Sequence, residues 1–122
     1  MAYEVTVIKE FAAAHKLVAY PGNCSQVHGH TWKVELVVVG DKLDDIGMLI
    51  DFRQVKRILD NIITEYDHTY LNDIPPFDTI NPTAENIAKI IYDRASIMLE
   101  NYKVKLVKVW ESPNAYITYG EE

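Results

Sequence analysis

Cysteine is almost absent from this 122-residue sequence, in which Cys24 is the single example. One cysteine cannot form an internal disulfide, so we do not expect a small secreted protein that disulfides hold together. Long apolar runs are also missing, and the first residues, MAYEVTVIKEF, have no apolar stretch of the signal-peptide type. These features lead us to expect a protein of the reducing cytoplasm that does not span a membrane.

Basic residues are too few to form a strongly positive surface. The 12 Lys and Arg residues face 18 Asp and Glu residues, the net charge is −6, and no local run of Lys or Arg offsets it. Nucleic acids and anionic membranes bind basic patches, so we expect neither as a partner. A small anionic substrate stays open, because a metal ion and a few local cations can outweigh the global charge.

The length and the apolar pattern predict one domain, covering residues 1–122, of the α+β class. Apolar residues alternate along 3–11 and 28–39, as in half-buried strands, and residues 12–17 either prolong the first strand or bend away. Shorter strands are expected over 104–110 and 115–119. Two helices are expected between the second and the third strand, so the order is ββααββ. The two helices back a four-stranded, mostly antiparallel sheet.

Both expected helices have recognisable starts. Asp51 is the expected N-cap of a helix that ends near Tyr66, and Asn81 is the expected cap of a helix with Pro82 at its first position. Apolar residues recur at three- and four-residue steps along each. The sheet that these helices cover has open edges, which small proteins often hide by pairing with further copies.

Three of the four histidines, His15, His28 and His30, lie within sixteen residues. His28 and His30 are two apart on an expected strand, so both point to the face that carries its apolar residues. His15 from the neighbouring strand would complete three nitrogen ligands, the pattern of a catalytic zinc site with an open position. Iron, copper and nickel also accept imidazole. The alternative is a set of core histidines with backbone partners, which is less favoured for two on one apolar face.

Cys24, four residues before His28, has three possible roles. It can be a fourth ligand that closes a structural site, a base or nucleophile beside an open metal, or a small buried apolar residue. Its polar neighbours in the sequence disfavour the last role. A base role requires a nearby cation, because a thiol with a pKa of about 8.5 is little ionised at neutral pH.

Other polar residues stand near the ends of expected elements. Asp67 precedes His68, and a carboxylate that orients an imidazole is an acid–base device, although a histidine past a helix C-terminus also interacts favourably with the dipole. Glu111, at a strand end, can accept two N–H bonds from a planar heterocycle, but most such glutamates face water. Thr83 and Glu85 read first as residues of a helix's first turn.

Five short motifs follow one another along the chain: FAAAH at 11–15, CxxxHGH at 24–30, DHxYLN at 67–72, PTAEN at 82–86 and WES at 110–112. Together they resemble the 6-pyruvoyl-tetrahydropterin synthase family, and the spacing of Cys24 is similar to that of its 6-carboxy-tetrahydropterin synthases of queuosine (7-deazaguanine) biosynthesis. The resemblance implies a T-fold, in which three subunits form a twelve-stranded barrel and two trimers commonly stack as a hexamer, with active sites at subunit interfaces.

The resemblance also implies roles for individual residues. His15, His28 and His30 would bind Zn²⁺, Cys24 would be the catalytic thiol, and Asp67 and His68 of a neighbouring subunit would complete a proton relay. Glu111 would hold the pterin edge, and Thr83 would add a ring contact. The positive residues Lys16, Lys33 and Arg53 are candidates for the triphosphate by charge alone.

The implied reaction converts 7,8-dihydroneopterin triphosphate to 6-carboxy-5,6,7,8-tetrahydropterin, with release of acetaldehyde and triphosphate. Two alternatives stay open. The first is the elimination of triphosphate that gives 6-pyruvoyl-tetrahydropterin, and the second is a pterin- or metal-binding module without catalysis.

Overall fold

The computed structural model describes residues 1–19, 22 and 26–120, so Cys24 lies outside the described residues. Along the chain, the strands and helices are β1 (Tyr3–His15), β2 (His28–Gly40), α1 (Phe52–Ile63), β3 (Thr69–Tyr70), the short 3-10 helix η2 (Leu71–Asp73), α2 (Ala84–Met98), β4 (Lys103–Ser112) and β5 (Ala115–Tyr119). Residues 12–15 therefore prolong the first strand, one of the two options that the sequence left open.

The sheet has five strands in the order β3-β1-β2-β4-β5, and not the four that the sequence predicts. The β1–β2, β2–β4 and β4–β5 pairs are antiparallel, as expected. The additional strand β3 runs parallel to β1 and pairs only with Ala13 and Ala14. Two residues are too few to produce an alternating apolar pattern, so this strand could not be recognised from the sequence.

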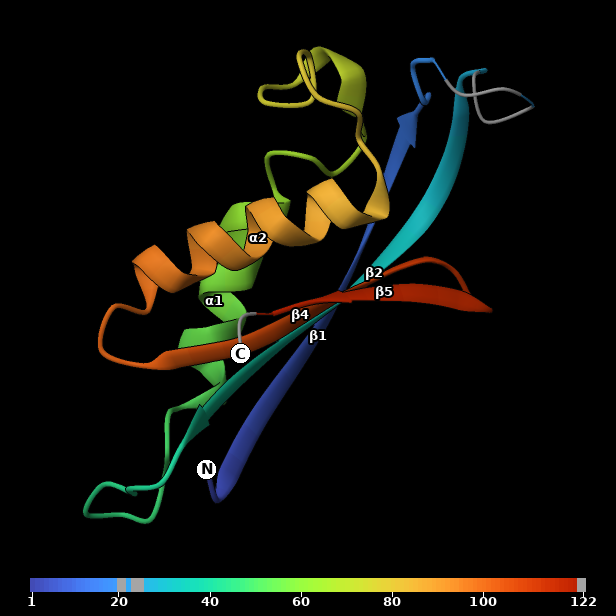
Figure 1. Cartoon of the computed structure of the whole chain (residues 1–122). Helices are drawn as coiled ribbons and strands as arrows, with labels where there is room; N and C mark the ends of the chain where they lie inside the picture. The colour runs from blue at the N-terminus through green and yellow to red at the C-terminus, as the bar shows by residue number, and fades with distance from the viewer. Residues whose placement is uncertain (20–21, 23–25, 121–122) are drawn as a thin grey trace.

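Both helices lie on one side of the sheet (Figure 1), in agreement with the predicted arrangement. The β2 side chains that face them, Trp32, Val34, Leu36 and Val38, are all 0% exposed. His28 and His30 have the same parity along the strand and continue this apolar face to its end. The alternation predicted for residues 28–39 is confirmed as far as Leu36, beyond which Val37 and Val39 are buried as well. It carries two histidines to the margin of the core.

The predicted start of α1 is confirmed, but its predicted end is wrong. The carboxylate of Asp51 accepts a hydrogen bond from the Arg53 backbone N–H at 2.8 Å, which caps the helix. The helix ends at Ile63. Beyond it the Tyr66 N–H donates to the Ile63 carbonyl, three residues back instead of four, and the His68 N–H leaves the helix direction and donates to the Ala12 carbonyl. Tyr66 nevertheless stays buried, so its apolar character reflects packing beyond the helix.

The predicted cap of α2 is also corrected. The helix begins at Ala84 and its N-cap is Thr83, whose hydroxyl accepts from the Asn86 N–H at 3.1 Å. Asn81 and Pro82 lie before the helix, and their polar groups bind the segment that includes His15 and Val18. Within the described part of the chain, no helix has the length and apolar character that crossing a membrane requires.

Candidate metal centre and active site

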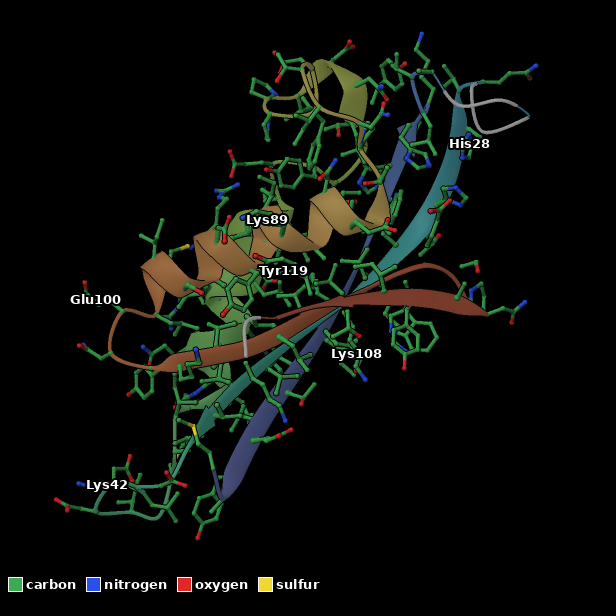
Figure 2. The ribbon with its side chains drawn as sticks, in the orientation of Figure 1. His28, Lys42, Lys89, Glu100, Lys108 and Tyr119 are labelled. Carbon is green, nitrogen blue, oxygen red and sulfur yellow. The ribbon has the colours of Figure 1, made fainter. Side chains whose placement is uncertain are left out.

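Two neighbouring strands bring the three histidines together. β1 ends at His15 and β2 begins at His28, and the antiparallel register places these two residues opposite each other. His30 is opposite Ala13, two residues further along each of the two strands. Figure 2 shows His28 at this end of β2, with side chains of the neighbouring strand beside it. The convergence predicted from the sequence is therefore present.

The ring nitrogens are close enough to share one ion. His15 Nε2 lies 3.0 Å from His28 Nε2, and the ring centroids of the three histidines are 4.5–5.2 Å apart. One ligand atom from each histidine and one carboxylate oxygen of Glu111 all lie within 4.8 Å of one another. A cluster of this size can hold a metal ion.

Hydrogen bonds fix which nitrogen of the His15 and His28 rings faces the cluster. His15 Nδ1 donates to the Pro82 carbonyl at 2.7 Å, and His28 Nδ1 donates to the Gln26 carbonyl at 2.8 Å. Because a carbonyl only accepts, both Nδ1 atoms carry the hydrogen, and in the neutral rings each Nε2 keeps a lone pair. Two lone pairs 3.0 Å apart repel each other unless a cation lies between them. The arrangement fits a metal ion bound by Nε2.

His30 provides a second sign of the same kind. Its Nε2 is buried and has no hydrogen-bond partner among the described residues. Glu111 Oε1 lies 3.1 Å away, but the direction of approach does not make a hydrogen bond. A buried polar atom left in this state costs about 1–3 kcal/mol, which a metal–nitrogen bond would remove.

Burial favours the neutral form of His15 and His30, which is the form that binds a metal. Desolvation is the largest influence on His15 and lowers its pKa below the ordinary 6.5, against the opposing effects of the Pro82 carbonyl and Glu111. Desolvation likewise lowers the pKa of His30, and Glu111 again opposes it. Both rings are therefore neutral at pH 7, as ligation requires.

Glu111 lies nearer to the histidines than the sequence suggested. Its Oε1 is 3.1 Å from His30 Nε2 and 3.8 Å from His15 Nε2, while 35% of its side chain is exposed. The register of β4 against β5 shifts between Trp110 and Ser112, and this irregularity surrounds Glu111. A carboxylate in this position can ligate a metal or accept hydrogen bonds from a bound molecule.

An open cavity of about 610 Å³ borders this cluster, with a lining that includes Glu10, His30, Thr31, Lys33, Trp110 and Glu111. Of the three cations considered for the triphosphate, Lys33 lines this cavity. Arg53 instead pairs with Asp51 at the start of α1, at 2.9 Å. Lys16 lines a different cavity. The structure thus favours Lys33 among the three by position.

Asp67 and His68 form a pair in spite of being adjacent in the sequence. Asp67 Oδ1 is 2.9 Å from His68 Nδ1, and it also accepts the Ala12 N–H at 2.9 Å, which is the main reason that the Asp67 pKa is lowered. The backbone bend that such a pair needs is present, since φ of His68 is 59°. The His68 side chain is 83% exposed and borders a second open cavity together with His30.

Thr83 and Cys24 are the remaining site residues expected from the sequence. The Thr83 hydroxyl is used as the N-cap of α2, one position before the first turn in which the sequence placed this residue. Cys24 falls outside the described residues. The carbonyls of Pro82 and Gln26, which orient two histidines, could not be recognised from the sequence because every residue has a carbonyl. The sequence placed Pro82 at the start of a helix, but it did not indicate that the Pro82 carbonyl orients His15.

Comparison with known proteins gives a consistent result. The sequence pattern of the family described as 6-pyruvoyl tetrahydropterin synthase matches residues 4–122. A Bacillus subtilis protein named 6-carboxy-5,6,7,8-tetrahydropterin synthase is 37% identical over an alignment 126 residues long, gaps included. The alignment covers 96% of this chain and 84% of the relative. A Pyrococcus furiosus protein named dihydroneopterin monophosphate aldolase is 38% identical over 87 residues, which cover 70% and 71%. The solved structure of Caenorhabditis elegans 6-pyruvoyl tetrahydropterin synthase superposes with a TM-score of 0.88 at 23% identity, covering 98% and 96% of the two chains, and so agrees in fold.

Proposed function

The chain belongs to the 6-pyruvoyl tetrahydropterin synthase family of enzymes, and we propose that it converts 7,8-dihydroneopterin triphosphate to 6-carboxy-5,6,7,8-tetrahydropterin, in the biosynthesis of queuosine precursors. Acetaldehyde and triphosphate leave, and one water is consumed to balance the atoms. The observation that carries this proposal is the cluster of three histidines and Glu111 beside an open cavity. The name of the Bacillus subtilis relative supports the choice of reaction.

The cofactor in this proposal is Zn²⁺, held by His15, His28 and His30. Three imidazole ligands, with the fourth coordination position left open for a water or substrate oxygen, are typical of catalytic zinc. Such an ion polarises substrate oxygens and makes hydroxyl groups more acidic. Pro82 and Gln26 hold the ligand rings in the orientation that presents Nε2.

The protein side chains bind the substrate and move its protons. Glu111 accepts the N–H groups of the planar pterin edge, and this fixes the ring relative to the reacting side chain. Cys24 removes a proton as the thiolate, and His68 returns one through Nε2 while Asp67 holds its Nδ1–H. Thr83 adds a ring contact in this scheme.

The proposal includes an assembly and a location. Three chains close a T-fold barrel, as trimers or stacked hexamers, and the Asp67–His68 pair of one chain serves the metal centre of the next. The exposure of His68 supports such a role, since 83% of its side chain is accessible in a single chain. The scarcity of cysteine supports a cytoplasmic location, and the net charge of −6 supports a small-molecule substrate over nucleic acid or membrane.

The decisive experiment incubates the zinc-loaded protein with 7,8-dihydroneopterin triphosphate and identifies every product by mass. Acetaldehyde together with a 6-carboxy pterin supports the proposal. A 6-pyruvoyl product would identify the elimination reaction instead, and bound pterin without turnover would indicate a binding module. Dihydroneopterin monophosphate belongs in the same assay, because the Pyrococcus furiosus relative is named for that substrate.

Glu111 has two possible partners, and one substitution separates them. In Glu111→Gln, a pterin-binding role predicts weaker pterin affinity by about tenfold or more with full zinc content, because a charge-assisted pair of hydrogen bonds is lost. A ligand role predicts loss of zinc instead. Zinc content by atomic absorption and pterin affinity by calorimetry distinguish these outcomes.

A further inference from the structure

One stretch of chain, residues 67–81, supplies hydrogen-bonding groups along the outer edge of β1. At Ala12 the backbone N–H donates to the Asp67 carboxylate at 2.9 Å, and the carbonyl accepts the His68 N–H at 2.6 Å. β3 then pairs with Ala13 and Ala14. Alternate residues of an extended chain direct their backbone polar groups to the same side. The even-numbered positions of β1 therefore face this edge.

Beyond β1, two asparagine side chains take the place of a partner strand. The Asn72 carboxamide accepts the Lys16 N–H at 2.9 Å and donates to the Lys16 carbonyl at 3.0 Å. The Asn81 carboxamide does the same for Val18, at 2.8 Å and 3.0 Å. Each amide offers one donor and one acceptor side by side, as a residue of a neighbouring strand would. Lys16 and Val18 are two apart, the spacing at which backbone groups face one side of a strand, and the chain enters a turn at Val18.

The segment held in this way begins at the candidate metal centre. His15 directly precedes Lys16, and the His15 ring is oriented by the carbonyl of Pro82, the residue after Asn81. The two amides and this carbonyl thus fix the backbone and the ring of His15 from one loop. A shift of residues 16–18 would therefore move His15.

We propose that Asn72 and Asn81 are positioning residues, which hold the chain that leaves His15 and thereby set the geometry of the metal centre. The effect of this position on turnover rests on the proposed function. Neither asparagine has to touch the substrate for this effect. Their influence reaches the reaction through His15.

The test replaces each asparagine by a group of the same shape. Asn72→Asp and Asn81→Asp keep the acceptor for the backbone N–H but set a carboxylate oxygen against the backbone carbonyl, which breaks one bond of each pair. Asn101→Asp, at an exposed position in the turn before β4, is the matched control for the added charge. Should an Asp variant fail to fold, Asn72→Ala and Asn81→Ala remove both bonds without a charge.

Two readouts report on position and not merely on stability. We expect the visible spectrum of the Co²⁺-substituted protein to change, and kcat to fall by about tenfold with little change in KM. Asn101→Asp should match the unmodified protein in both.

The outcomes separate this inference from the proposed function. Variants that fold but keep the spectrum and kcat would show that the two asparagines only stabilise the loop, and would overturn the inference. An unmodified protein that turns over none of the pterin substrates would overturn the proposed function alone. The cobalt spectrum would then still decide the inference.

Discussion

At the scale of single residues, the histidine Nε2 atoms of the candidate metal centre have no favourable partner among the described residues. His30 Nε2 has no hydrogen-bond partner among the described residues, and the Nε2 lone pairs of His15 and His28 face each other at 3.0 Å. Both conditions are unfavourable without a cation and are relieved by one. The two hydrogen bonds to the carbonyls of Pro82 and Gln26 hold these rings in place.

Loss of one imidazole should therefore remove the metal without unfolding the chain. His30→Ala is expected to weaken zinc binding by more than about 100-fold, because loss of a group that merely orients a ligand already costs about 10- to 100-fold. Competition with a chelating dye measures the affinity, and circular dichroism checks the fold. His68→Ala is the matched control and should keep its zinc. Full zinc binding by His30→Ala would contradict the assignment of this ligand.

The histidine pKa values also predict how the metal-free protein responds to acid. Burial lowers the pKa of His15 and His30 in the folded chain, so below about pH 6.5 the unfolded chain binds more protons than the folded one. The stabilisation is complete above that pH and is lost as the pH falls through the lowered values. The slope is at most about 1.4 kcal/mol per pH unit for each histidine.

Urea unfolding of the metal-free protein between pH 8 and pH 5 measures this effect. The free energy of unfolding should be level at the upper end of the range and should decline toward its lower end. His30→Gln, which does not titrate, should show a shallower decline. Equal profiles for the two proteins would mean that His30 does not contribute.

At the scale of elements, the sequence predicted what depends on local periodicity and missed what depends on long-range register. The alternation over residues 28–39 correctly placed His28 and His30 on the core face, and Asp51 was correctly identified as a cap. The position of Glu111 beside the histidines depends on the pairing of β4 with its neighbours and on an irregularity in its register, which leave no local pattern. The contact between Asp67 and His68 depends on a positive φ at His68, a conformation that histidine adopts uncommonly.

The correction at the start of α2 leads to a prediction for Thr83. Its hydroxyl caps the helix, so Thr83→Ala should lower the free energy of unfolding by about 1 kcal/mol, while Thr83→Ser should retain most of that stability. Thermal unfolding measures the difference. A rise in KM for the pterin in Thr83→Ala that exceeds that of Thr83→Ser would support the additional ring contact, and equal KM values would leave Thr83 as a cap only.

At the scale of the whole molecule, the sheet ends in very unequal strands. β5 has five residues, whereas β3 has two and covers β1 only at Ala13 and Ala14. Among the described residues, no strand lies beside the outer edge of β1 from residue 3 to residue 11. Edges of this kind are places where further copies can pair. The proposed trimer would use them and would bring His68 of one chain toward the metal centre of another.

Mixing two inactive variants tests whether the relay crosses between chains. Cys24→Ala and His68→Ala should each lack turnover, but assemblies that contain both should recover part of it, because some sites then combine an intact thiol with an intact imidazole. The variants are mixed, exchanged under mild denaturant, reassembled and assayed. Reassembled Cys24→Ala alone is the control. Absence of recovery in mixed assemblies of confirmed composition would assign the relay to the chain that carries the metal.

The short length of β3 has a practical consequence for handling the protein. Outside the proposed trimer, the edge of β1 over residues 3–11 has no neighbouring strand among the described residues, and every second residue along it directs a backbone donor and acceptor outward. Such an edge also pairs with the wrong chains. Under this proposal, dilution or mutations that loosen the trimer should lead toward insoluble material more readily than toward a well-behaved free subunit, and preparations for crystallisation or storage are best kept concentrated.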